Sequence, residues 1–137
     1  MTEIITTLVF DSRMESIPEL RGPNVEDRHL IYEGGGVILD LLLKLAKEGS
    51  CLHVGGQVLP GEDTKDSVSD LPVLMEQGTK RSYTHTNALG EFTFHSIPNG
   101  RFDLAITLGG RRFKVRGLLN EQPRNWRVVP SMALGGD

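Results

Sequence analysis

Several features that mark special classes of protein are missing from this chain. A single cysteine, Cys51, among 137 residues leaves no internal disulfide and no metal centre built from several cysteines. No apolar run approaches the roughly 18 residues that a membrane-spanning helix needs. The first residues carry no basic stretch followed by an apolar one, so we expect no secretory signal and a cytoplasmic location.

Aromatic side chains are also scarce, at 6% of the residues, with one tryptophan and two tyrosines. Because few rings are left for stacking on sugars, a carbohydrate-binding or adhesive module is a weaker alternative. Nucleic-acid binding is disfavoured as well, because the chain shows no ladder of exposed aromatic residues and is acidic, with a pI near 5.8.

Enough apolar residues are present for one hydrophobic core. Leu, Ile, Val and Phe supply 40 of the 137 residues, well above the roughly one fifth below which a chain is typically disordered. Most apolar runs are short and bounded by Gly, Pro, Asn or Asp, which is typical of antiparallel strands. This pattern predicts an all-β, antiparallel sandwich whose strands cover 6–11, 29–33, 37–46, 51–59, 72–77, 81–86, 91–95, 102–108 and 111–116, with one more around 127–129.

Two hairpins are predicted in the second half. A Gly109-Gly110 turn places Leu108, Ile106 and Leu104 opposite Arg111, Phe113 and Val115, and Thr107, Ala105 and Asp103 opposite Arg112, Lys114 and Arg116. A turn over 87–90 pairs 81–86 with 91–95 and puts Tyr83 beside Phe94. The stretch 97–100 connects the two hairpins tightly.

The segment Val37–Glu48 is ambiguous, because its leucines fit both strand alternation and helical spacing. We favour a strand, since residues 47–50 form a natural hairpin loop into the strand that follows.

Four segments occur in an order that matches a known pattern: GQVL at 56–59, LPVLM at 71–75, TNALGEFTF at 86–94 and IPNGRFDL at 97–104. Together they resemble the carboxypeptidase regulatory-like domain, a transthyretin-like β-sandwich, over residues 52–116. The resemblance implies a Greek-key sandwich with a core over 51–118, an N-terminal strand extension over 1–50 and a tail over 119–137.

Domains of this family usually do no chemistry and act as stability, spacing or protein-interaction modules, and in bacteria we expect them beside regulatory or signalling proteins. The resemblance therefore implies a non-catalytic accessory subunit. Some transthyretin relatives process purine-derived substrates, so a small-ligand-binding or hydrolase-like protein is the alternative. Those relatives carry a C-terminal Tyr-Arg-Gly-Ser-type motif, whereas this chain has Leu134-Gly135-Gly136-Asp137.

The residues themselves predict no catalytic, cofactor or metal site. Cys51 lies in an apolar strand without a basic neighbour in sequence. The acidic stretch 62–70 lacks the ligand spacing of a calcium-binding EF-hand loop, so a solvated loop is favoured. No two of the histidines have the helical spacing of a zinc enzyme, and the predicted hairpin register points the last two to opposite faces. These histidines are His29, His53, His85 and His95.

Charge is distributed unevenly along the chain. Residues 1–79 contain 6 basic and 14 acidic side chains, whereas residues 80–137 contain 9 basic and 4 acidic ones. The excess of positive charge gathers on one hairpin, which predicts a surface for an acidic protein partner. The sequence thus favours a protein-binding or regulatory module that acts through a sheet edge, such as the N-terminal strand, or through this basic face. The candidate binding residues are Arg101, Arg111, Arg112, Lys114 and Arg116.

Overall fold

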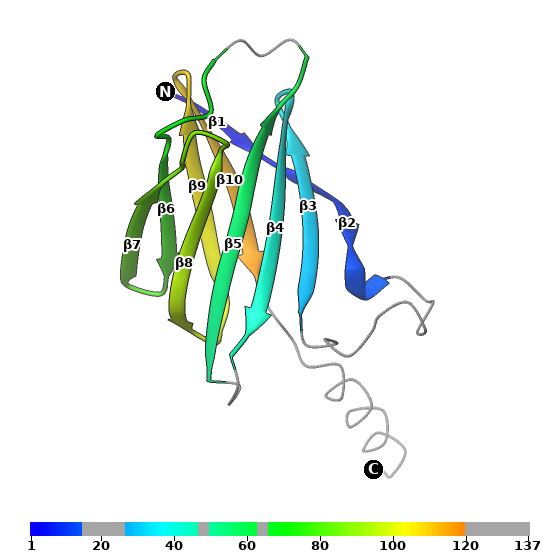
Figure 1. The fold of residues 1–137 in the computed structure, drawn as a ribbon, viewed down its shortest axis with the longest axis vertical. Helices are drawn as coiled ribbons and strands as arrows, with labels where there is room; N and C mark the ends of the chain where they lie inside the picture. The colour runs from blue at the N-terminus through cyan, green and yellow to red at the C-terminus, as the bar shows by residue number, and fades with distance from the viewer. Residues whose placement is uncertain (15–26, 47–49, 63–65, 120–137) are drawn as a thin grey trace.

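Two β-sheets pack face to face in this protein (Figure 1). The structure is a computed structural model, and it describes residues 1–14, 27–46, 50–62 and 66–119. Sheet A has the strand order β1-β10-β9-β6-β7, and sheet B has the order β2-β3-β4-β5-β8. The predicted all-β sandwich is confirmed. Within the described ranges, no helix is long and apolar enough to cross a membrane.

The elements follow the predicted runs closely in the second half of the chain. Their bounds are β1 Thr2–Ile5, β2 Thr7–Asp11, the 3-10 helix η1 Ser12–Met14, β3 Arg28–Gly34, β4 Val37–Leu45, β5 Cys51–Pro60, β6 Pro72–Gln77, β7 Lys80–His85, β8 Glu91–Pro98, β9 Phe102–Leu108 and β10 Arg111–Leu118. The strand predicted around 127–129 lies outside the described residues.

The ambiguous segment 37–48 forms strand β4 over its described part. β4 pairs with β3 on one side and with β5 on the other, so it lies inside sheet B. Its alternate side chains Val37, Leu39, Leu41 and Leu43 are fully buried. Strand alternation therefore explains the leucines, because a strand sends every second side chain into the core.

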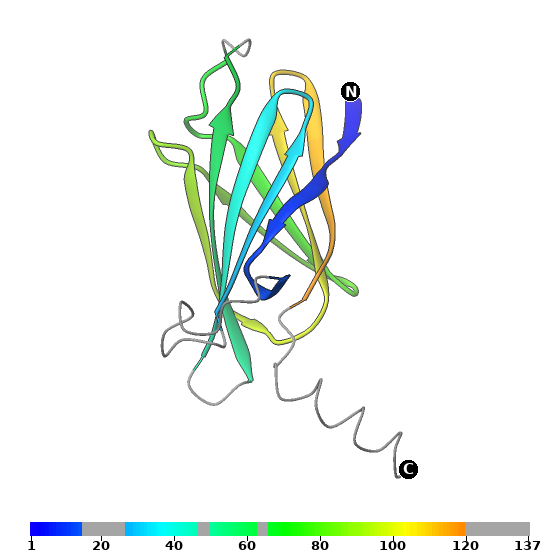
Figure 2. The same cartoon turned by 90° about the vertical axis from the view of Figure 1, so that its right-hand side faces the viewer.

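The N-terminal part of the chain differs from its prediction in two ways. The strand expected over 6–11 corresponds to β2, but an unpredicted strand, β1, precedes it in the other sheet, and the two run diagonally along one side of the sandwich (Figure 2). Buried Thr6 joins them, and both its backbone N–H and its hydroxyl donate to the carbonyl of Lys114. β1 runs parallel to β10, so the expectation of a wholly antiparallel sandwich is wrong at this pair.

The β9–β10 hairpin is confirmed up to its far end. Gly109 and Gly110 have φ of 57° and 77°, a conformation that glycine adopts without strain. The predicted pairing of Asp103 with Arg116 is wrong, because a bulge shifts the register between Val115 and Leu118. In that bulge the backbone N–H of Gly117 donates to Asp103 Oδ1 at 2.8 Å.

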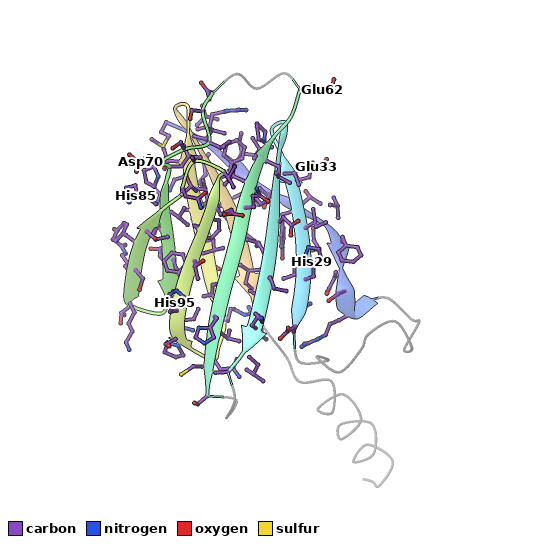
Figure 3. All side chains as sticks on the ribbon, viewed as in Figure 1. His29, Glu33, Glu62, Asp70, His85 and His95 are labelled. Atoms are coloured by element: carbon purple, nitrogen blue, oxygen red, sulfur yellow. The ribbon has the colours of Figure 1, made fainter. Side chains whose placement is uncertain are left out.

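The second predicted hairpin is wrong. β7 pairs with β6 in sheet A, whereas β8 pairs with β5 in sheet B, so residues 86–90 cross between the sheets. Figure 3 shows His85 at the end of β7 and His95 on β8. Buried Thr86 holds the crossing, because its hydroxyl accepts from the N–H of Leu71 at 2.8 Å and donates to the carbonyl of Val68 at 2.6 Å.

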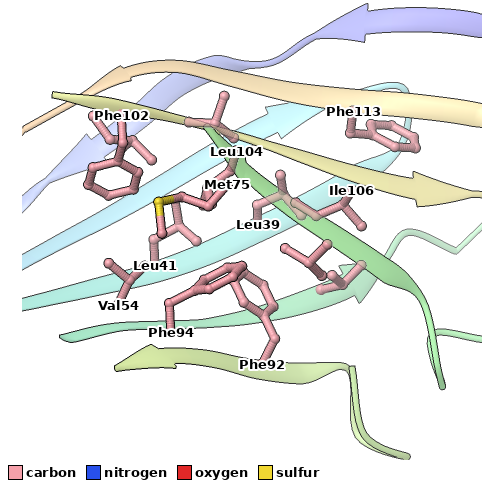
Figure 4. Packing of buried hydrophobic residues seen from close by; sticks show 14 of the residues in the cluster. Leu39, Leu41, Val54, Met75, Phe92, Phe94, Phe102, Leu104, Ile106 and Phe113 are labelled. Atoms are coloured by element: carbon pink, nitrogen blue, oxygen red, sulfur yellow. The ribbon is translucent and has the colours of Figure 1, made fainter. Parts of the chain in front are cut away.

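The core fills the space between the sheets (Figure 4). The rings of Phe92 and Phe94 on β8 meet edge to face with centroids 6.2 Å apart. Gly56 lies beneath them on β5, and a Cβ there would lie 2.3 Å from the Phe92 ring. This close approach explains why glycine occupies the middle of an apolar strand.

Candidate functional site

The candidate site is a hollow on the outer face of sheet A, away from the core. Its volume is about 370 Å³. The strands that form it are β6, β7, β9 and β10, which lie next to one another in the sheet. The lining residues are Pro72, Leu74, Glu76, Arg81, Tyr83, Ala105, Thr107, Arg112 and Lys114.

One small residue explains why the sheet is hollowed here. Ala105 on β9 lies between two longer side chains, since it is opposite Lys114 on β10 and opposite Leu74 on β6. Leu74 is in turn opposite Tyr83 on β7. Ala105 and Leu74 are 4% and 8% exposed, whereas Tyr83 is 67% exposed. The hollow therefore has an apolar floor and an accessible aromatic ring at its side.

Positive charge exceeds negative charge around the hollow. Arg81 Nε lies 3.1 Å from Glu76 Oε2, and Lys114 Nζ lies 3.8 Å from Glu3 Oε2 on β1. Arg112 Nε is buried and has no hydrogen-bond partner among the described residues. Arg112 as a whole is half-buried in the lining, so its side chain stays accessible to an anion in the hollow.

The five predicted binding residues do not act as one group. Arg112 and Lys114 line the hollow, whereas Arg101 and Arg116 are exposed outside its lining. Arg111 has a different role, because its guanidinium lies 5.0 Å from the centroid of the Phe113 ring and its Nη1 donates to the carbonyl of Gly35 at 2.9 Å. It joins the β9–β10 hairpin to the β3–β4 turn.

Sequence reasoning missed the part of the hollow that comes from β6 and β7. Arg81, Tyr83 and Leu74 reach the site only because β6 pairs with β9, about thirty residues away in the chain. Alternation along β6 and β7 places Leu74, Glu76, Arg81 and Tyr83 on one face of each strand. It does not show which strand pairs with β6.

The four histidines do not form one group. His29 Nε2 is 2.5 Å from Asp40 Oδ1 on the outer face of sheet B. The rings of His53 and His95 meet with centroids 5.7 Å apart, and His53 Nδ1 accepts from the backbone N–H of Ser96 at 3.2 Å. Within the described part of the chain, no three His, Cys, Asp or Glu side chains form a group that could hold a metal ion. Residues 63–65 of the acidic loop lie outside the described residues.

A half-buried ion pair joins β2 to β3, on the sheet opposite the hollow. Arg28 binds both carboxylate oxygens of Asp11, with Nη2 at 2.6 Å from Oδ2 and Nε at 3.1 Å from Oδ1. Burial raises the pKa of Asp11, but the hydrogen bonds from Arg28 and from the backbone of Arg13 outweigh burial and hold the pKa below its usual range. The pair stabilises the fold.

β2 also exposes an apolar edge. It is the outermost strand of sheet B, and Leu8 and Val9 are 43% and 54% exposed. No charged residue occurs between Thr7 and Phe10. Charged residues commonly protect an edge strand from pairing, as Lys80 and Arg81 do on β7, so β2 is the less protected edge.

No protein-family model, no curated protein and no solved structure matches this chain. The carboxypeptidase regulatory-like assignment therefore stays a prediction from the motifs at 56–59, 71–75, 86–94 and 97–104. A fold alone does not fix a function, which depends on the chemistry of the site.

Proposed function

We propose that this protein is a non-catalytic binding module of the cytoplasm, which docks an acidic protein partner on the outer face of sheet A and acts as a regulatory accessory subunit. The observation that carries the proposal is Arg112, a half-buried cation in the wall of the hollow whose Nε has no hydrogen-bond partner in the described part of the chain. An acidic surface placed there would pair with the charge of Arg112 and would be attracted by the surrounding positive charge.

The motif resemblance supports the same reading, because domains of the carboxypeptidase regulatory-like family serve mainly as interaction modules. The exposed edge of β2 is a second docking candidate, since Leu8 and Val9 leave it open to strand addition. The two surfaces differ in chemistry: the hollow attracts charge, whereas the β2 edge offers main-chain hydrogen bonds and apolar contact.

A small anionic ligand is the competing function. The volume of about 370 Å³ falls within the range of roughly 300–1,000 Å³ of small-molecule pockets. This alternative predicts binding of a free acid in the absence of any protein partner.

The proposal is tested by affinity purification from the native cell with quantitative mass spectrometry. The test variant is Arg112→Glu with Lys114→Glu, and the matched control is Arg101→Glu with Arg116→Glu, which changes the net charge equally outside the hollow. We expect an acidic partner that is lost with the test variant, kept with the control and released by salt. Equal capture by both variants would overturn the proposal, as would a protein that captures nothing.

A further inference from the structure

We infer that the hollow on sheet A recognises one carboxylate together with a neighbouring aromatic side chain, so that its occupant is a short acidic segment with a bulky apolar anchor. The inference rests on the proposed function and specifies what part of the partner enters the site. A strongly acidic surface without an anchor would use only the charge of the hollow and would leave its floor uncovered.

The charges around the hollow indicate a single carboxylate. Three cations line it, but Arg81 faces Glu76 and Lys114 faces Glu3, so two of them already have an acidic neighbour. Among the residues that the structure describes, Arg112 is the lining cation without an acidic neighbour. Arginine suits a carboxylate better than a lysine does, because its planar guanidinium can bind both carboxylate oxygens at once.

The floor and side of the hollow indicate the apolar anchor. Leu74 and Ala105 present aliphatic surface at the bottom, and the ring of Tyr83 stands largely exposed beside them. An aromatic side chain lying over Ala105 would contact Leu74 below and Tyr83 at its edge. Aromatic pairs of this kind favour offset or edge-to-face contact, which adds to the gain from burying the anchor.

The depth of the hollow depends on Ala105. Substitutions at this residue therefore test the apolar anchor separately from the carboxylate contact at Arg112. Its neighbours across the sheet, Lys114 and Leu74, are both longer. An Ala105→Leu change would fill the space for the anchor and leave Arg112 and Lys114 in place. Arg112→Gln does the reverse, since it removes the charge and keeps the space.

The test is a titration of the isotope-labelled full chain, followed by NMR, with a capped Gly-Glu-Phe-Gly peptide. Two further peptides replace its Glu by Gln or its Phe by Ala. We expect the first peptide to shift amides of β6, β7, β9 and β10, and each replacement to weaken binding about tenfold, the effect of roughly one hydrogen bond to a charged group or one lost apolar contact.

The variants assign each effect to its residue. Ala105→Leu should weaken the Phe peptide about tenfold and leave the Ala peptide unchanged, and Arg112→Gln should remove the preference for Glu over Gln. Arg116→Gln, a cation outside the lining, should bind as the unchanged chain does. Ala105→Val, which adds less volume, repeats the filling experiment if Ala105→Leu does not fold.

Three results would overturn the inference. They are peptide shifts away from the hollow, equal binding of the Phe and Ala peptides, and binding of free 3-phenylpropionate as tightly as the peptide, which would indicate a small acid instead of a protein segment. The native partner distinguishes this inference from the proposed function. If the partner is lost with Arg112→Glu and Lys114→Glu but kept with Ala105→Leu, the proposed function stands and the apolar anchor is refuted.

Discussion

Two neighbouring glycines on β5 allow a sharp test of the packing. At Gly56, an added Cβ would lie 2.3 Å from Phe92 Cζ and 2.9 Å from Leu41 Cδ2, both within the core. At Gly55, an added Cβ would meet nothing within 4 Å, because that position faces outward. The two positions share a strand and differ in the side of the sheet that they face.

We expect opposite effects from Gly56→Ala and Gly55→Ala. Overpacking a core by one methyl group against rings typically costs roughly 1–3 kcal/mol of unfolding free energy. Alanine in the interior of a strand, where space is free, gains about 0.5–1 kcal/mol over glycine by restricting the unfolded chain. Restriction of the unfolded chain favours both variants alike, so they should differ by the overpacking cost alone, about 1–3 kcal/mol.

Urea denaturation followed by circular dichroism measures this difference. The slope of the free energy against urea should be the same in both variants, since the surface exposed on unfolding is nearly unchanged. Adding Phe92→Leu to Gly56→Ala should recover part of the lost unfolding free energy, because a leucine leaves room for the alanine methyl group. Equal stability of the two alanine variants would refute the placement of the Phe92 ring over Gly56.

Three further predictions concern single side chains. Asp11→Asn should reduce the loss of stability in acid. The lowered pKa of Asp11 means that its carboxylate stabilises the fold above the unfolded pKa, and this contribution is lost as the pH falls through the folded pKa. Urea unfolding of both proteins at pH 7 and pH 3 measures the difference. Thr86→Ala should cost roughly 1–3 kcal/mol, since the buried N–H of Leu71 loses its acceptor, and Thr86→Ser should restore most of it in thermal melts. Val9→Lys should change the unfolding free energy by less than about 0.5 kcal/mol, because Val9 is exposed, and a large loss would place β2 differently.

The comparison of the two predicted hairpins shows which sequence signals are sufficient. The Gly109-Gly110 turn allows one tight geometry, and apolar alternation on both sides of it agrees with that geometry. The turn over 87–90 has ordinary turn residues, which fit a hairpin and a crossing between sheets equally well. Buried Thr86 decides between them through its hydrogen bonds to Leu71 and Val68, and these lie 15 and 18 residues away in the chain.

The candidate site was predicted only in part for the same reason. Arg112 and Lys114 were identified because they alternate with buried residues on one strand. Arg111 was placed with them by its position at the turn, although its guanidinium contacts Phe113 and Gly35. Such a contact depends on which turn of the other sheet lies near Arg111, and a local sequence pattern does not predict that neighbour.

The all-β class, the strands β2 to β10 and the register of the β9–β10 hairpin next to its turn follow from local physical chemistry along the chain. Side-chain alternation and turn residues act over a few positions, so they can be read along the chain. Three features come from tertiary pairing instead: β7 and β8 lie in different sheets, β1 runs parallel to β10, and Ala105 lies between Lys114 and Leu74 to form a hollow. These features depend on pairing between distant strands, whose free energy comes from burying both sheets at once.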